Sequence, residues 1–328
     1  MEPRATLNYA EETLKTLEKQ GYHFVGTHKH SAVKTCLWLR KSIRGEGNCY
    51  KGKFYGISAH RCIQMTPSIF CNQSCIHCWR PLEAFNIGAD EEQVVWDSPA
   101  EIVEDCIKEQ KRLISGFKGS DKTSTAAFAE AAIPKHAAIS LIGEPTLYPY
   151  LKELIQNFHS RDMTTFVVSN GTNPEVLREI RPYQLYISLN APDEATYKKA
   201  SHAQYWPRIN ESLEEMGKLK GKTRRVIRIT CIEGLNITNP AGYAELLERA
   251  NPDFIEVKAY MHIGYSRKRL SRDAMPSHLR VKEFAREIAE ALTALGYNYT
   301  IADESEISRV VLISNLSLKE KKHPKPVT

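Results

Sequence analysis

The 328-residue sequence has no long apolar run: nothing in it approaches the roughly twenty consecutive apolar residues that a membrane-spanning helix needs. Its first residues, Met1-Glu-Pro-Arg-Ala-Thr, lack the apolar core of a signal peptide, and no tandem repeat or low-complexity linker follows them. These absences predict a cytoplasmic protein without a membrane partner. Hydrophobic residues make up 42% and charged residues 26%, as in ordinary globular proteins, and the length allows one barrel-sized domain or two smaller ones.

Cysteine is not scarce, and three of the eight cysteines lie in one short window, Cys71-Asn-Gln-Ser-Cys75-Ile-His-Cys78. A structural zinc site needs four ligands, usually as two separated pairs, and this window has no fourth cysteine close by. Three closely spaced thiolates suit a [4Fe–4S] cluster that leaves one iron open to another ligand. A zinc knuckle or three unrelated thiols is the alternative interpretation.

The C-x3-C-x2-C loop resembles that of the radical S-adenosylmethionine (SAM) enzymes. In that family the open iron chelates the amino and carboxylate groups of SAM, and one electron from the cluster splits the sulfonium to give a 5′-deoxyadenosyl radical. The resemblance therefore implies a radical enzyme with SAM and a [4Fe–4S] cluster as cofactors.

From residue 62 onward, short β-branched runs alternate with helical stretches, which predicts parallel strands joined by helical crossovers. The predicted strands are 62–65, 137–142, 165–169, 185–189, 226–231 and 255–260. The predicted helices are 99–116, 149–160, 174–180, 193–199, 207–219, 240–250 and 277–295. This α/β pattern resembles the partial (β/α)6 TIM-type barrel of radical SAM enzymes, with the cysteine loop at the C-terminal end of the first strand, where barrel chemistry gathers.

The remaining segments lead us to divide the chain into four regions. Residues 1–61, with helices predicted at 8–19 and 31–43 and a strand at 22–25, form an N-terminal extension. The barrel core is predicted at 62–265, a C-terminal extension that completes the barrel at 266–315, and a disordered charged tail at 316–328.

A second set of cysteines, Cys36, Cys49 and Cys62, has a regular C-x12-C-x12-C spacing. Equal spacing has no physical force by itself, and buried core cysteines are equally compatible with it. Cys106 and Cys231 have no partner motif and are predicted to be core residues.

The neighbours of the second set favour a specific family. Together with both cysteine sets, segments 48–56, 256–270 and 308–314 resemble the tRNA 4-demethylwyosine synthases, over residues 20 to 315. The chain looks like the archaeal form, which lacks a flavodoxin-like domain. The resemblance implies two [4Fe–4S] clusters, one on each cysteine set, with pyruvate on the open iron of the second, and a separate electron donor of flavodoxin or ferredoxin type.

The substrates that the resemblance implies are N1-methylguanosine, next to the anticodon of tRNA-Phe, and pyruvate. The deoxyadenosyl radical removes a hydrogen from the N1-methyl group, the carbon radical adds to the pyruvate carbonyl carbon, and ring closure gives the tricyclic base. Such an enzyme is a lyase that we expect to act as a monomer.

Several polar residues at predicted strand ends match the SAM contacts of radical SAM enzymes. Gly143-Glu144-Pro145 resembles the element that binds the methionyl amino group, which a carboxylate suits. Each of these positions is also compatible with an ordinary turn or cap. The predicted SAM-contacting residues are Glu144, Ser169, Asn170, Ser188, Asn190, Ile232 and His77, the last shaping the adenine pocket.

Two further predictions concern the substrates. Lys51 supplies an amine that condenses with a ketone such as pyruvate to form a Schiff base, and Lys53 is a nearby competitor. The basic stretch of Arg267, Lys268, Arg269 and Arg272 is predicted to bind tRNA phosphates. A second basic stretch at 218–228 is the alternative binding face.

Two other functions stay open at this point. A two-cluster radical SAM enzyme that modifies peptides would place its extra cysteines after the barrel, whereas here they precede it. A zinc-dependent RNA-binding protein without catalysis would use the same cysteines and basic stretches.

Overall fold

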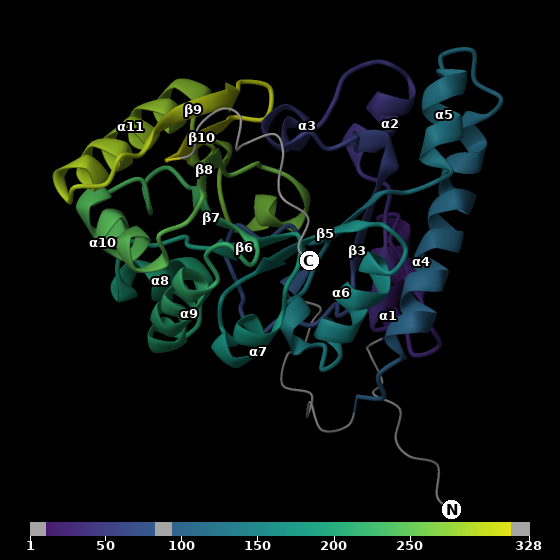
Figure 1. The fold of residues 1–328 in the computed structure, drawn as a ribbon, viewed down its shortest axis with the longest axis horizontal. Coiled ribbons are helices and arrows are strands. Elements are labelled where there is room, and N and C mark those ends of the chain that lie inside the picture. The colour runs from purple at the N-terminus through teal and green to yellow at the C-terminus, as the bar shows by residue number, and fades with distance from the viewer. Residues whose placement is uncertain (1–10, 83–93, 316–328) are drawn as a thin grey trace, which may run out of the picture. The chain divides into compact units, whose positions relative to one another are not determined.

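The computed structural model describes residues 11–82 and 94–315, which form two compact units (Figure 1). The first unit falls within residues 1–49, 57–72 and 80–165, and the second within 50–56, 73–79 and 166–328. The predicted tail at 316–328 and the first residues of the helix predicted at 8–19 lie outside the described residues. Among the described residues, no helix has both the length and the apolar character needed to cross a membrane.

The first unit is a small sheet covered by helices. Its strands run in the order β1-β2-β3-β4: β2 is antiparallel to both β1 and β3, and β3 is parallel to β4. The strands are β1 (His23–Val25), β2 (Ser31–Val33), β3 (Cys62–Thr66) and β4 (His136–Ile139). The helices are α1 (Glu11–Lys19), α2 (Leu37–Ile43), α4 (Pro99–Ile114), α5 (Thr125–Ala131) and α6 (Leu151–His159).

Helix α4 shows how the local sequence sets an element. Ser98 caps its N-terminus by accepting a hydrogen bond from the backbone of Glu101, and Pro99 occupies the first turn, where no backbone donor is needed. Buried residues recur at Ile102, Cys106 and Gln110, one turn apart. This face packs against β1, β2, β3 and α6.

The second unit carries the longer run of parallel strands. Its strands follow the order β5-β6-β7-β8-β10-β9, parallel from β5 to β8 and antiparallel beyond. They are β5 (Thr164–Ser169, which begins at the boundary), β6 (Gln184–Ser188), β7 (Arg224–Cys231), β8 (Phe254–Ala259), β9 (Thr300–Ser305) and β10 (Val310–Ser314).

Helices of the second unit follow one another along the strands (Figure 1): α7 packs on α9, α9 on α10, and α10 on α11. Helix α11 also contacts β8, β9 and β10. The helices are α3 (Tyr50–Tyr55), α7 (Pro174–Glu179), α8 (Glu194–Ser201), α9 (Trp206–Lys218), α10 (Pro240–Ala250) and α11 (His278–Ala294), and the 3₁₀ turns η6 (Gly264–Lys268) and η7 (Arg272–Ala274) follow β8.

The six predicted barrel strands are present as β3 to β8, and each predicted helix after residue 98 is present within two or three residues of its expected bounds. The helix predicted at 31–43 is wrong in its first part, because residues 31–33 form strand β2, whose Ala32 pairs with Thr66 of β3. Helices α3 and α5 and strands β9 and β10 were not among the predicted elements. The predicted domain bounds stay a prediction.

Candidate active site

In the first unit, the chain leaves strand β3 and enters the cysteine loop against the turn that follows β4. Gly143 in that turn has a φ of +73°, and a Cβ added there would lie 2.0 Å from the Ser68 carbonyl oxygen and 2.6 Å from that of Phe70. The backbone of Glu144 donates a hydrogen bond of 2.6 Å to the same Phe70 oxygen. Glycine is therefore required where the Gly-Glu-Pro turn contacts the backbone that leads to Cys71.

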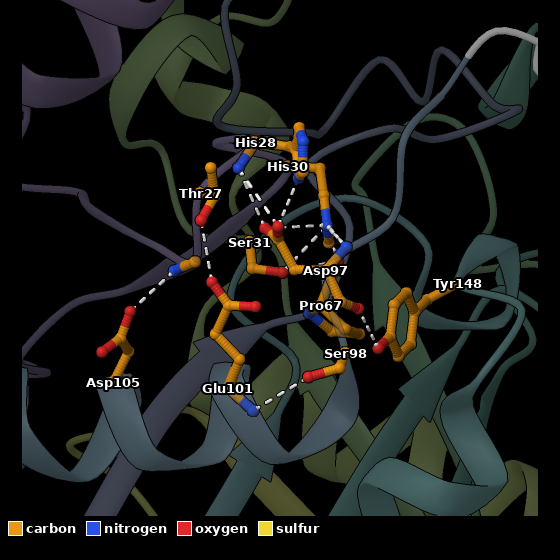
Figure 2. Close-up of polar contacts among 11 residues, drawn as sticks. Thr27, His28, His30, Ser31, Pro67, Asp97, Ser98, Glu101, Asp105 and Tyr148 are labelled. Atoms are coloured by element: carbon orange, nitrogen blue, oxygen red, sulfur yellow. Dashed lines mark hydrogen bonds and ion pairs between the residues drawn. The ribbon is translucent and has the colours of Figure 1, made fainter.

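A buried polar network fixes the residues just before the loop (Figure 2). Asp97 donates from its backbone to Nε2 of His30 at 2.8 Å, so Nδ1 of His30 carries the proton that it donates to the Pro67 carbonyl at 2.8 Å. Burial lowers the pKa of His30, which keeps the ring neutral at physiological pH. The backbone of Ile69 donates in turn to the His30 carbonyl at 2.9 Å. These bonds set the direction in which the chain leaves β3.

In the second unit, residues 73–79 of the loop are bound through their backbone. The amides of Ser74 and Ile76 each donate a hydrogen bond of 3.0 Å, to the carbonyls of Ser201 and Ala200 at the end of α8. The Arg269 guanidinium donates to the carbonyls of Ile76, at 3.1 Å, and Cys78. A segment without regular secondary structure thus has its backbone groups paired.

His77 lies between the last two cysteines of the loop. Its Nδ1 atom is buried and has no hydrogen-bond partner among the described atoms. Burial, and secondarily the charge of Arg269, lower the pKa of His77 to about 4. The ring is therefore neutral at physiological pH.

The eight cysteines fall into two kinds of surroundings. Cys106 and Cys231 are fully buried, and burial raises the pKa of Cys231 to about 12 and that of Cys106 further. Cys71 is buried at the loop entry, whereas the other five cysteines are partly exposed: Cys36, Cys49, Cys62, Cys75 and Cys78. The two isolated cysteines thus behave as the predicted core residues.

The second cysteine set lies in the first unit, at the ends of elements. Cys36 caps helix α2 with its sulfur, which accepts a hydrogen bond of 3.3 Å from the Leu39 backbone, and Cys62 begins β3. Within residues 11–82 and 94–315, no three His, Cys, Asp or Glu side chains are arranged around a position for a single metal ion. The assignment of these thiols to a four-iron cluster accordingly depends on the sequence pattern.

Lys51 and Lys53 occupy opposite environments although they share the short helix α3. The Nζ atom of Lys51 lies 4.8 Å from the centroid of the buried Tyr186 ring and 5.7 Å from that of Phe166. Lys53 is exposed and forms an ion pair of 2.6 Å with Asp303 of β9. Only the first of the two amines is therefore directed into the interior of the second unit.

A buried ion pair lies beside Lys51. Glu256 of β8 is fully buried and pairs with Arg228 of β7 at 2.8 Å, its direct neighbour in the strand register. Tyr55 and Tyr50 of α3 donate hydrogen bonds of 2.7 and 3.0 Å to the same carboxylate. Burial alone would raise the pKa of Glu256, but the charges of Arg228 and then of Lys51 outweigh it, so the pKa lies below its ordinary value.

The sequence reasoning missed this network. The signal that could have revealed it is a charged residue within each of two otherwise buried strands, Arg228 in β7 and Glu256 in β8. Charged residues are almost never fully buried unless they are paired. Two oppositely charged residues on neighbouring buried strands therefore predict an ion pair between them.

The predicted tRNA-binding residues are divided by the structure. Arg267, Lys268 and Arg272 are exposed on η6 and η7, after the end of β8. Arg269 is partly buried, and its guanidinium binds the carbonyls of the cysteine loop.

Comparisons with known proteins bear directly on this arrangement. Residues 65–247 match the family described as the radical SAM superfamily, and residues 249–315 match the family described as wyosine base formation. The SAM-dependent tRNA 4-demethylwyosine synthase of Pyrococcus abyssi is 48% identical over 94% of this chain and 90% of its own length. The corresponding protein of Methanocaldococcus jannaschii is 46% identical over 94% and 97%.

The chain belongs to the tRNA 4-demethylwyosine synthase family of radical SAM enzymes. The predicted function and enzyme class are confirmed at this level, and family membership implies SAM, a [4Fe–4S] cluster and a tRNA substrate. The human member is 34% identical, and the match covers 93% of this chain and 41% of the human protein.

Solved structures of the same family confirm the fold. One, described as TYW1 with a lysine–pyruvate adduct bound, has a TM-score of 0.82 and 43% identity and covers 93% of this chain and 96% of its own. Another, described as archaeal TYW1, has a TM-score of 0.76 and 40% identity and covers 98% and 99%. The predicted α/β fold of the radical SAM barrel type is thereby confirmed.

Most of the residues predicted to contact SAM lie at or just after strand ends, and they also contact neighbouring residues of the protein. The Glu144 carboxylate accepts hydrogen bonds from the backbone and hydroxyl of Thr146, at 3.0 and 2.6 Å. Asn190 accepts one of 2.8 Å from the Thr230 backbone, and Ile232 is buried against Tyr260.

Two other predicted contacts bind neighbouring backbone: Ser169 accepts from the backbone of Gly171 and Asn170 from that of Thr172, each at 3.0 Å. Ser188 is the last residue of β6 and is partly exposed. The assignment of all these residues to SAM stays a prediction.

The close approach at Gly143 generates a testable expectation. Gly143→Ala should destabilise the protein by about 1–3 kcal/mol more than Gly21→Ala, because both introduce a side chain at positive φ but only the first meets backbone oxygens. Urea unfolding of both variants measures the difference, and SAM cleavage should fall only in the first. Equal losses of stability would mean that the turn moves away at no cost.

Proposed function

We propose that this enzyme condenses N1-methylguanosine, next to the anticodon of tRNA-Phe, with pyruvate to form 4-demethylwyosine. The observation that supports this reaction best is the inward amine of Lys51 beside the buried Glu256–Arg228 pair. A lysine in such a position is suited to a 2-keto acid, because its amine attacks the keto carbon and water leaves to give an imine.

The cysteines would hold two [4Fe–4S] clusters, with Cys71, Cys75 and Cys78 on the first and Cys36, Cys49 and Cys62 on the second. The donor chemistry fits: thiolates are the protein ligands of such clusters, and five of the six sulfurs belong to partly exposed residues. When bound, the first cluster and SAM supply a carbon radical, and the second cluster offers an open iron for pyruvate. The electrons come from an external donor of flavodoxin or ferredoxin type.

The choice of Lys51 over Lys53 follows from the surroundings of the two amines. Lys53 is held by Asp303 and by the Glu304 carbonyl, both at 2.6 Å, on the exposed edge of β9. Lys51 lies over aromatic rings near a buried carboxylate. A solved relative with 43% identity is described as carrying a lysine–pyruvate adduct, which supports a lysine as the pyruvate-binding group here.

The Glu256–Arg228 pair would orient the amine and exclude competing reactions. Glu256 keeps a negative charge close to Lys51, and Arg228, whose side chain is 18% exposed, balances that charge. Removing one member of a buried pair typically costs about 3–5 kcal/mol, because the other charge is left uncompensated. The pair should therefore also stabilise the surroundings of Lys51.

Exposed cations after β8 would bind the anticodon loop through its phosphates, with Arg267, Lys268 and Arg272 as the contacts. A methylated purine has to leave the anticodon stack to reach an amine directed into the interior of the second unit, so we include base flipping in the proposal. The enzyme would act as a monomeric lyase in the cytoplasm.

The two cysteine sets should differ in what their loss abolishes. Cys75→Ala should remove about four irons and abolish formation of 5′-deoxyadenosine, whereas Cys62→Ala should remove about four irons, retain SAM cleavage and make no tricyclic base. Iron analysis and mass spectrometry of the tRNA measure both effects. Cys106→Ala, in a buried helix position, is the control that should change neither. Normal iron content and normal tRNA modification in Cys62→Ala would assign the second set to the core.

Trapping of pyruvate should distinguish the two lysines. Borohydride reduction of the enzyme with carbon-labelled pyruvate should leave label on the peptide that contains Lys51. Lys51→Ala should lose the label and the tricyclic product but keep both clusters and SAM cleavage, while Lys53→Ala, which removes an exposed ion pair and a hydrogen bond to the Glu304 carbonyl, should keep them all. Label on Lys53 would contradict the choice of Lys51, and full activity of both variants would contradict the formation of an imine with pyruvate.

The proposed tRNA face should be visible in the salt dependence of binding. Replacing Arg267, Lys268 and Arg272 together by Ala should lower the slope of log K against log salt by about 0.7–0.9 for each lost phosphate contact. SAM binding should be unchanged. The matched control replaces Lys218, Lys220 and Lys222, which are equally exposed. A change of slope in the control variant alone would place tRNA on that second face.

A further inference from the structure

Turn η6 and the residue after it present their cations to two different surroundings. Arg267 and Lys268 are exposed, and Lys268 lies over the ring of Tyr265 at 4.7 Å. Arg269 is partly buried and donates from Nε to the Ile76 carbonyl at 3.1 Å and from a terminal nitrogen to the Cys78 carbonyl. Neighbouring cations thus face outward and toward the cysteine loop.

The turn binds the same loop at a second place. The Tyr265 backbone donates a hydrogen bond of 3.0 Å to the Trp79 carbonyl. Gly264 has a φ of +58°, and a Cβ added there would lie 2.6 Å from that carbonyl oxygen and 2.9 Å from the Trp79 Cβ. The approach is therefore possible only with glycine at position 264.

The turn itself is fixed to the end of strand β8. Ser266 is fully buried, donates to the Ile263 carbonyl at 2.6 Å and lies 2.9 Å from the hydroxyl of Tyr260. Tyr260 belongs to a core cluster against which Ile76 of the loop also packs. Because turn and loop share a close-packed core, a displacement of one is transmitted to the other.

We propose that Arg269 is a positioning residue of the cysteine loop, and that turn η6 couples tRNA binding at Arg267 and Lys268 to SAM cleavage. The inference rests on the proposed function, in which Cys75 and Cys78 bind the cluster used for SAM. Phosphates bound by Arg267 and Lys268 restrict the movement of turn η6. The hydrogen bonds that Arg269 donates to the Ile76 and Cys78 carbonyls then restrict the movement of the cysteine loop. In this role Arg269 acts through the backbone of Ile76 and Cys78, whose carbonyls accept its hydrogen bonds.

The test compares Arg269→Lys, Arg269→Gln and the unaltered enzyme, each reconstituted anaerobically, with and without tRNA-Phe. In the unaltered enzyme, tRNA should raise the rate of 5′-deoxyadenosine formation roughly fivefold or more and should slow amide hydrogen exchange in residues 73–79. Both variants should lose these responses while their iron content and tRNA affinity change little. Lysine keeps the charge but not the planar fork, so a simple phosphate contact would survive in Arg269→Lys.

A second variant tests the same link without touching any charge. Gly264→Ala should lose both responses, because its Cβ displaces the turn from Trp79. The matched control is Gly296→Ala, which has a positive φ of +86° but no atom within 4 Å of its added Cβ, and which should keep them.

Two results would overturn the inference: a tRNA response that persists in Arg269→Lys and Gly264→Ala, or an unaltered enzyme that cleaves SAM equally fast without tRNA. Loss of tRNA affinity in Arg269→Gln with normal exchange in residues 73–79 would make Arg269 a phosphate contact instead. Absence of SAM cleavage in the unaltered enzyme would contradict the proposed function rather than this coupling.

Discussion

The centre of the second unit depends on one buried carboxylate, that of Glu256. Taking such a charge out of water costs several kcal/mol unless partners compensate it, and here the partners come from two elements. Arg228 supplies the opposite charge from β7, while Tyr50 and Tyr55 supply hydrogen bonds from α3. A helix as short as α3 has little stability of its own, so these bonds fix its rotation. That rotation directs Lys51 inward and Lys53 outward.

The cysteine loop illustrates a different constraint, which is that its backbone must be paired without regular secondary structure. In the first unit, the carbonyl oxygens of Pro67 and Phe70 accept hydrogen bonds from the His30 ring and the Glu144 amide, respectively. In the second unit, the amides of Ser74 and Ile76 bind the end of α8. Each unit thus holds its own part of the loop, and the residues that do so are ordinary in sequence. Backbone partners of this kind leave no motif, because any residue supplies an amide and a carbonyl.

The sequence predicted the regular part of the fold well, since β-branched runs and helical periodicity are local properties. It failed where the element was short or its stability came from elsewhere. Residues 31–33 have no strand pattern of their own and become β2 by pairing with β3. Strand β10 pairs antiparallel with β8 on one side and with β9 on the other, which an alternating strand–helix pattern does not anticipate.

The sequence predicted the candidate site only where the type of a single residue indicates its chemistry. Cysteine spacing drew attention to the thiols, but the Gly-Glu-Pro turn gave no sign that Gly143 closely approaches the backbone of Ser68 and Phe70. The direction in which a side chain points cannot be predicted from the type of the residue. Lys51 and Lys53 are equivalent in the sequence, as are Arg267 and Arg269, and in each pair one residue faces solvent while the other faces the interior.

The surroundings of the cysteines distinguish residues that their spacing alone does not. A thiol binds iron as a thiolate, so a site that opposes ionisation also opposes ligation. Cys106 and Cys231 are in such sites, because burial raises the pKa of both. Cys36 differs from them in position, because it is partly exposed and its sulfur accepts a hydrogen bond of 3.3 Å from the Leu39 backbone at the start of α2. Equal spacing of Cys36, Cys49 and Cys62 carries no weight by itself, but partial exposure separates all three from Cys106 and Cys231, which only fill the core.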